Sequence, residues 1–169
     1  MTLTVWTFNS TGAADDALPV LARLVSEGAV VVEDAAVVSW PEGRRKPSGR
    51  PVKDVFGEGM LWDGTWGMIL GMIFLVPIAG PSFGAAAGAF AGALWNLGLD
   101  DNFVKSVRDT VTPGTSALFA LCGDDAASRL TGELHGQDVG LIQSRLSHEQ
   151  QLRIRETMGK ETERPRPGR

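Results

Sequence analysis

The residues that could act as nucleophiles, general acids or metal ligands are few and scattered in this sequence. The chain has one cysteine, Cys122, and two histidines, His135 and His148, and none of them stands at a metal-ligand spacing from another. Cys122 ends the apolar run SALFALC, which predicts a buried strand thiol, because a reactive thiol needs an electropositive, accessible setting. The histidines are expected at the surface, beside helix ends. A single cysteine also excludes an internal disulfide.

Adjacent aspartates occur three times, and a pair of carboxylates is one way to build a catalytic site. Each pair opens a segment with helical periodicity, so N-capping and the helix dipole account for them without chemistry. The pairs are Asp15-Asp16, Asp100-Asp101 and Asp124-Asp125. The glycine-rich stretch at 57–67 lacks the Lys-Ser/Thr of a phosphate-binding loop and is expected to be a hinge. We predict no catalytic residue, no metal site, no cofactor and no enzymatic activity.

Length and charge narrow the class of protein further. At 169 residues the chain fits one domain, or one domain with an insertion. A net charge of −4 without a basic face argues against nucleic acid as a partner. The N-terminal residues MTLTVWTF have no basic start and no long apolar core, so we expect no signal peptide and a cytoplasmic N-terminus.

The elements that the patterns predict alternate between strand and helix. Strands are expected at 2–9, at 29–40 (long, or with a bulge), after the turn at 112–115, and within 137–146. Helices are expected between residues 10 and 28, with Ser10 or Asp15 as cap and Gly28 as stop, and at 124–134, capped by Asp124. Pro19 fits the first helix if its regular part begins near Asp15 or Asp16; otherwise Pro19 kinks the helix. The order is βαβ-βαβ, which predicts an α+β fold, a ferredoxin-like four-stranded antiparallel sheet with two helices on one face.

This frame would be split by a long insertion. Residues 1–41 and 112–146 form the split domain, and residues 42–59 read as a basic linker. An apolar helical hairpin at 60–98 follows, and a connecting helix at 99–111 is capped by Asp100 or Asp101. Residues 147–158 open with a capping box and predict a C-terminal helix, and residues 159–169 are expected to be a disordered tail.

The hairpin carries a stripe of glycines. Residues 64–99 contain no charged side chain, and the bulky apolar residues fall on the helix faces opposite the glycines. Glycine costs a helix roughly 1 kcal/mol relative to alanine, so the pattern favours close helix packing as in lipid. The residues predicted to pack are Gly64, Gly67, Gly71, Gly80, Gly84, Gly88 and Gly92. Pro77, Gly80 and Pro81 would separate the two helices, and large side chains would face outward.

Aromatic and basic residues sit at one end of this hairpin. Trp62, Trp66 and Trp95 would form an aromatic belt at the membrane surface. The basic run Arg44, Arg45 and Lys46 is either a solvated loop or a contact with anionic lipid. A helix over 60–76 reaches roughly 25 Å, short of the ~30 Å hydrocarbon core, so we expect a re-entrant or barely spanning hairpin that starts from the cytoplasm. The alternative is a soluble oligomer whose hairpins bury one another.

Several segments together resemble the bacterial and archaeal family known as domain of unknown function 1269. They are VEDAAVVSW, the stripe GPSFGAAAGAFAGAL, LGLDDNFVKSVRDTVTPGTSALFAL and SRLSHEQ, and the resemblance covers most of residues 1–158. It implies a ferredoxin-like frame with an inserted glycine-zipper hairpin and membrane association, and it brings no catalytic residues. Pro19 and the Pro/Arg-rich tail depart from the common pattern.

Two functions follow as hypotheses. The first is a non-enzymatic, self-assembling structural or interaction protein at the cytoplasmic side of the cell membrane, a homo-oligomer with membrane lipid as partner. The second is a soluble cytoplasmic assembly, a regulatory module that binds a small effector between ferredoxin-like subunits, and this rests on fold-level analogy alone.

Overall fold

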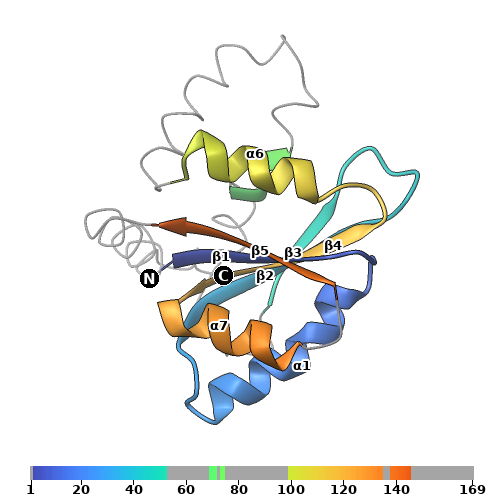
Figure 1. The fold of residues 1–169 in the computed structure, drawn as a ribbon. Coiled ribbons are helices and arrows are strands. Elements are labelled where there is room, and N and C mark those ends of the chain that lie inside the picture. Colours follow the sequence, from blue (N-terminus) through green and yellow to red (C-terminus); the bar gives the residue numbers. More distant parts are fainter. Residues whose placement is uncertain (1, 53–68, 72, 75–98, 135–137, 146–169) are drawn as a thin grey trace, which may run out of the picture.

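Five strands form one antiparallel sheet in the computed structural model, which describes residues 2–52, 69–71, 73–74, 99–134 and 138–145 (Figure 1). Within this part of the chain three helices accompany the sheet, and residues 69–71 and 73–74 are also helical. The predicted mixed α+β class is therefore confirmed. The elements in chain order are β1 (Thr2–Phe8), α1 (Ala13–Ser26), β2 (Val32–Trp40), β3 (Ser48–Pro51), α6 (Asp101–Thr110), β4 (Thr115–Cys122), α7 (Asp124–Glu133) and β5 (Val139–Arg145).

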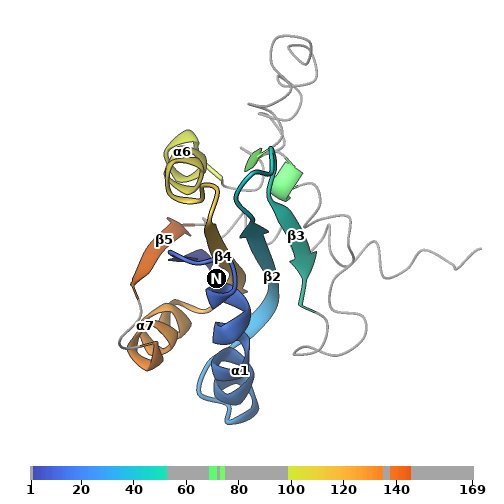
Figure 2. The same cartoon turned by 90° about the vertical axis from the view of Figure 1, so that its right-hand side faces the viewer.

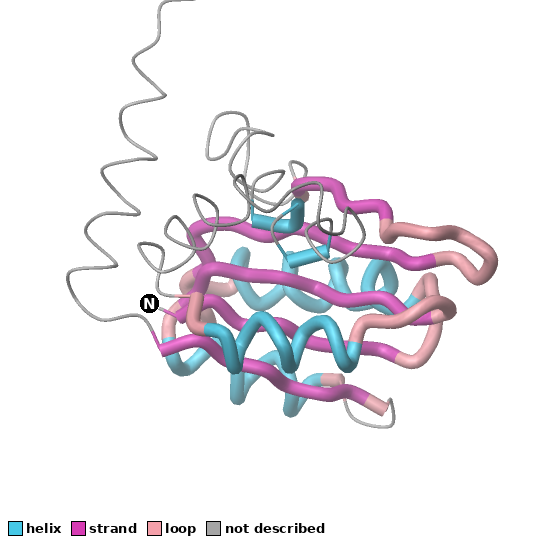
Figure 3. The backbone as a smooth tube through the Cα atoms, turned by 90° about the horizontal axis from the view of Figure 1, so that it is seen from above, coloured by secondary structure: helices cyan, strands magenta, loops and turns pink. Residues whose placement is uncertain are grey.

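The strand order in the sheet is β3-β2-β4-β1-β5, and every neighbouring pair is antiparallel. Viewed from above, the strands run side by side with helices on both sides of them (Figure 3). The register places Val5 of β1 opposite Phe119 of β4 and Ile142 of β5. Because strand side chains alternate between faces, this register fixes which residues share a face.

Both faces of the sheet are covered by apolar groups. Trp6, Val37 and Leu118 point into a cluster that α1 and α7 close from one side. Val5, Val38 and Phe119 belong to a second cluster, which α6 and residues 69–74 close from the other side. Figure 2 shows the helical residues 69–71 and 73–74 on the same side of the sheet as α6. The prediction of helices on one face only was incomplete, because all seven residues of β1 are buried and need cover on both sides.

The edge strand β3 corrects the prediction of a linker at 42–59. Ser48–Pro51 pairs with β2, with Arg50 opposite Val37, and the Val52 N–H donates to the Ala35 carbonyl at 2.9 Å. Pro51 lacks an N–H, which an edge strand tolerates. Arg50 also forms an exposed ion pair with Asp15 on α1. Of the two forms expected for β2, a long strand or one with a bulge, the register shift between Val32 and Asp34 supports the bulge.

Helix α1 begins earlier than Pro19 suggested. It starts at Ala13 after the N-cap residue Gly12, so Pro19 lies inside the helix, and no side chain caps it. The prediction that Ser10 or Asp15 caps this helix was wrong. A tertiary contact replaces the local cap, because the Ala14 N–H donates to the Ser116 hydroxyl of β4 at 3.0 Å, and that hydroxyl donates to the Ser10 carbonyl.

The end of α1 follows the prediction. Gly28 adopts a positive φ of 68°, its N–H donates to the Val25 carbonyl, and the next N–H, of Ala29, donates to the Leu24 carbonyl. These two bonds form a Schellman motif, for which glycine is the preferred residue.

Of the cap predictions for the other two helices, the one for α6 is confirmed and the one for α7 is wrong. Asp100 caps α6, because its carboxylate accepts from the Phe103 N–H at 2.7 Å. Asp124 does not cap α7; Gly123 holds that position, and the Asp124 carboxylate accepts from the Thr2 hydroxyl at 2.6 Å. Its bond therefore ties α7 to the start of β1, while its charge still lies in the first turn of the helix.

Replacing Asp100 with alanine is expected to lower the free energy of unfolding by about 1 kcal/mol, the usual cost of losing an N-cap. Asp109→Ala in the exposed last turn of the same helix removes an equal charge without a cap, and is expected to change stability little. Urea denaturation of both variants tests this. Equal losses would show that the Asp100 cap makes no specific contribution to the stability of α6.

Cys122 is fully buried in the first cluster, as the sequence predicted, and its Sγ lies 3.6 Å from the Thr4 hydroxyl. Burial raises the pKa of the Cys122 thiol above its ordinary value, which disfavours the reactive thiolate in the folded chain. We expect the folded protein at pH 8 to react with an aromatic disulfide reagent far more slowly than the urea-unfolded chain. An equally fast reaction in both states would place the thiol at the surface.

Candidate functional site

The best-defined candidate site is the place where the long insertion joins the sheet. Ile73 and Phe74, directly before residues 75–98 of the uncharged stretch, are 0% and 5% exposed, and Leu99, directly after them, is 3% exposed. All three belong to the second cluster, together with Val107 of α6 and Phe119 of β4. Both ends of the stretch are therefore fixed on the same face of the sheet.

Arg108 of α6 connects the helix to the first of these ends. Its Nε–H donates to the Ile73 carbonyl at 2.5 Å. A guanidinium group suits this position, because a hydrogen bond from a charged donor is stronger than one between neutral groups. Partial burial lowers the pKa of Arg108 from its ordinary value, and the group stays charged at every physiological pH.

The residues around this junction pack closely on β2 and β3. Leu70 lies over Gly49, where an added Cβ would stand only 2.5 Å from the Leu70 Cδ1 atom. Trp40, at the end of β2, meets Phe74 edge to face, with ring centroids 6.2 Å apart and an interplanar angle of 84°. Aromatic pairs favour this geometry. Glycine in the edge strand thus leaves room for the insertion.

These contacts correct one part of the predicted hairpin. Ile69 and Ile73 were expected to face outward, but both pack on the second face of the sheet. Gly71 is helical and half-buried, and on a helical wheel it lies about 130° away from the centre of the sheet-facing side chains. The other residues of the predicted site lie outside the described residues: Gly64, Gly67, Gly80, Gly84, Gly88, Gly92, Trp62, Trp66 and Trp95.

The basic run lies in the loop between β2 and β3. Arg44, Arg45 and Lys46 are exposed, and none of them forms an ion pair with another described residue. The loop backbone is held by the Trp40 indole N–H, which donates to the Arg44 carbonyl at 2.9 Å. The sequence indicates no role for Trp40 beyond ending a strand. The contacts of its indole ring depend on the fold, so no local pattern could have predicted them.

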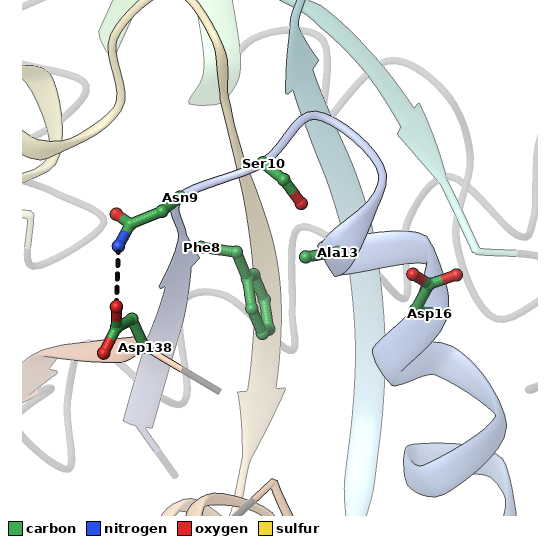
Figure 4. A pocket seen from close by; sticks show the side chains of 6 residues that line it. All are labelled: Phe8, Asn9, Ser10, Ala13, Asp16 and Asp138. Carbon is green, nitrogen blue, oxygen red and sulfur yellow. Dashed lines mark hydrogen bonds between the residues drawn. The ribbon is translucent and has the colours of Figure 1, made fainter. Parts of the chain in front are cut away.

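A pocket of about 360 Å³ lies elsewhere, at the end of β1 (Figure 4). Its lining includes Phe8, Asn9, Asp16 and Asp138, and the Asn9 amide reaches the Asp138 carboxylate at a long 3.5 Å. Asn9, Asp16 and Asp138 are exposed to solvent. An open hollow with solvated polar groups does not resemble the enclosed, mostly apolar sites that hold small ligands.

Other kinds of site find little support in the described residues. No group of three histidines, cysteines or acidic residues there is placed to hold a metal ion. No helix among them is long and apolar enough to cross a bilayer. His135 and His148 lie outside this part of the chain. So does GPSFG at 80–84, whose G-x-S-x-G spacing is that of a hydrolase nucleophile turn; because it falls within the glycine stripe, we assign it no catalytic role.

Arg108→Gln is expected to loosen residues 69–74, because a bond from a charged donor to the Ile73 carbonyl contributes about 1.5–3 kcal/mol. Hydrogen exchange of the amides at 69–74 should become faster, while exchange in α1 stays unchanged. Lys105→Gln removes an exposed charge from the same helix and serves as the control. Identical exchange in both variants would mean that apolar burial alone holds this segment.

Comparison with known sequences assigns the family. The model of the family described as "Protein of unknown function (DUF1269)" matches residues 60–159, more than half of the 169-residue chain. No curated protein and no solved structure matches the chain. The match spans the uncharged stretch, α6, β4, α7 and β5, and the chain therefore belongs to the DUF1269 family.

Proposed function

We propose that this chain is a non-enzymatic, self-associating protein that contacts the cytoplasmic side of the cell membrane through residues 75–98, carried on a ferredoxin-like frame. One observation carries the proposal. The residues that flank this uncharged, glycine-striped stretch, Phe74 and Leu99, are both buried in one cluster on one face of the sheet. A stretch that leaves and returns at the same face suits a hairpin better than a single crossing.

The strand order supports the ferredoxin-like part of the proposal. Without β3 the order is β2-β4-β1-β5, with α1 between β1 and β2 in the chain and α7 between β4 and β5. Two βαβ units interleave in this way in a split βαβ arrangement. The strand β3 would then be an addition at the β2 edge, made by the start of the insertion.

The length of the stretch sets how deep it would reach. Because residues 69–74 pack on the sheet, the part available for lipid begins near residue 75 and not at residue 60. The break at Pro77, Gly80 and Pro81 leaves one long arm in this stretch, the predicted helix over 82–97, which would reach roughly 24 Å. This is short of the ~30 Å hydrocarbon core, and favours a re-entrant hairpin over a spanning one.

The glycine spacing supports self-association. Gly80, Gly84, Gly88 and Gly92 recur at every fourth residue, so they would form a ribbon of exposed backbone along one side of a helix. Small residues at this spacing let two helices approach closely in lipid, which offsets the low helix propensity of glycine. Within the chain the partner would be the other arm, and between chains a second copy.

The test replaces Gly84 and Gly88 with leucine, which would fill the ribbon and keep the helices apart. We expect the double variant to lose its oligomer in detergent or its retention in carbonate-washed membranes. Ala86→Leu with Ala93→Leu adds nearly as much bulk, three carbons per site in place of four, to the opposite side of the predicted helix and is expected to preserve both. A wild-type protein found wholly in the soluble fraction as an oligomer would reject the membrane contact and favour the soluble assembly.

A further inference from the structure

The loop between β2 and β3 concentrates positive charge on a protein whose net charge is −4. Arg44, Arg45 and Lys46 are consecutive, exposed, and without ion pairs in the described part of the chain. The other arginine of this region, Arg50, differs because Asp15 neutralises it. Glu42 is the one acidic residue of this loop, so the loop keeps a net positive charge of +2 and forms a patch that attracts a negatively charged surface.

The fold fixes this loop next to the base of the insertion. Trp40 donates from its indole to the Arg44 carbonyl, and the same side chain contacts Phe74, which directly precedes residues 75–98. The backbone of Trp40 is anchored in turn, since its carbonyl accepts from the Gly114 N–H at 2.7 Å. In Figures 1 and 2 the loop lies on the same side of the sheet as α6. The Trp40 side chain therefore connects the basic loop to Phe74, where residues 75–98 begin.

We infer that Arg44, Arg45 and Lys46 are the contact of this protein with anionic lipid headgroups, so that its membrane partner is a negatively charged bilayer surface. The inference rests on the proposed function and adds the identity of the lipid. An uncharged stretch interacts equally with the core of any bilayer, whereas a basic loop beside it distinguishes anionic from neutral surfaces. The juxtaposition also sets the orientation, with the α6 side of the sheet toward the membrane and α1 and α7 away from it.

The full-length chain can be tested on vesicles of pure phosphatidylcholine and on vesicles with 30% phosphatidylserine. The wild type is expected to bind the anionic vesicles more tightly, and rising salt should remove the difference. Each lost cation should weaken binding to the anionic vesicles about fivefold, so Arg44→Gln with Arg45→Gln should weaken it about 25-fold. Binding to the neutral vesicles should not change.

The matched control removes two arginines from the α1 and α7 side, Arg23→Gln with Arg129→Gln. It changes the net charge equally and is expected to keep most of the anionic preference. If both double variants lose the preference equally, net charge explains it and the loop assignment is wrong. A wild type that binds both vesicle types equally would also overturn the inference while leaving the proposed function intact. Failure to bind either vesicle would reject both.

A direct contact measurement completes the test. A fluorophore on Ser48→Cys, with the buried Cys122 unreactive, should be quenched by lipids that carry a quencher at the headgroup. The same label on Ser128→Cys in α7 should be quenched much less. Equal quenching at the two positions, or binding to an oligonucleotide that anionic vesicles fail to displace, would contradict a lipid contact at this loop.

Discussion

The rest of this structure depends on the need to cover a sheet that is apolar on both faces. Strand β1 is buried at all seven positions, and β4 is buried at all but its first. Such strands need a layer on each side, because exposing either face would leave a large apolar area in water. α1 and α7 supply one layer from within the two βαβ units. The second layer comes from α6 and from residues 69–74, which belong to the insertion or directly follow it.

This second layer makes the insertion part of the folding unit. Ile73, Phe74 and Leu99 would cost the protein apolar burial if they left the sheet, and Arg108 adds a charged hydrogen bond to the Ile73 carbonyl. The uncharged stretch between them is consequently held at both ends on one surface. Trp40 extends the same constraint to the β2–β3 loop, so a basic loop and an apolar stretch are presented together.

The regular elements were predictable because their signals are local. The β-branched run of β2 and its bulge, the apolar face of α6 with its Asp100 cap, and the glycine that ends α1 depend on residues within a few positions of one another. The predictions that were wrong concern features that depend on residues far apart in the sequence. The strand β3 is a short, polar, proline-containing segment that forms only because β2 offers a free edge. Helix α1 has no local cap because Ser116, 102 residues away from Ala14, takes that role.

The sequence by itself determined four of the five described strands and the three described helices, but not β3. It also determined that Cys122 would be buried and that residues 64–99 carry no charge, because periodicity and composition are local properties of the chain. Only the tertiary structure decided that the bulky side of residues 69–74 faces the protein's own sheet, that both ends of the following stretch meet in one cluster, and that Trp40 connects it to the basic loop. Hydrophobic pattern identifies a face that must be buried, but it does not say which partner buries it. That choice is made by the geometry of the sheet and the surface still uncovered when the two βαβ units have formed.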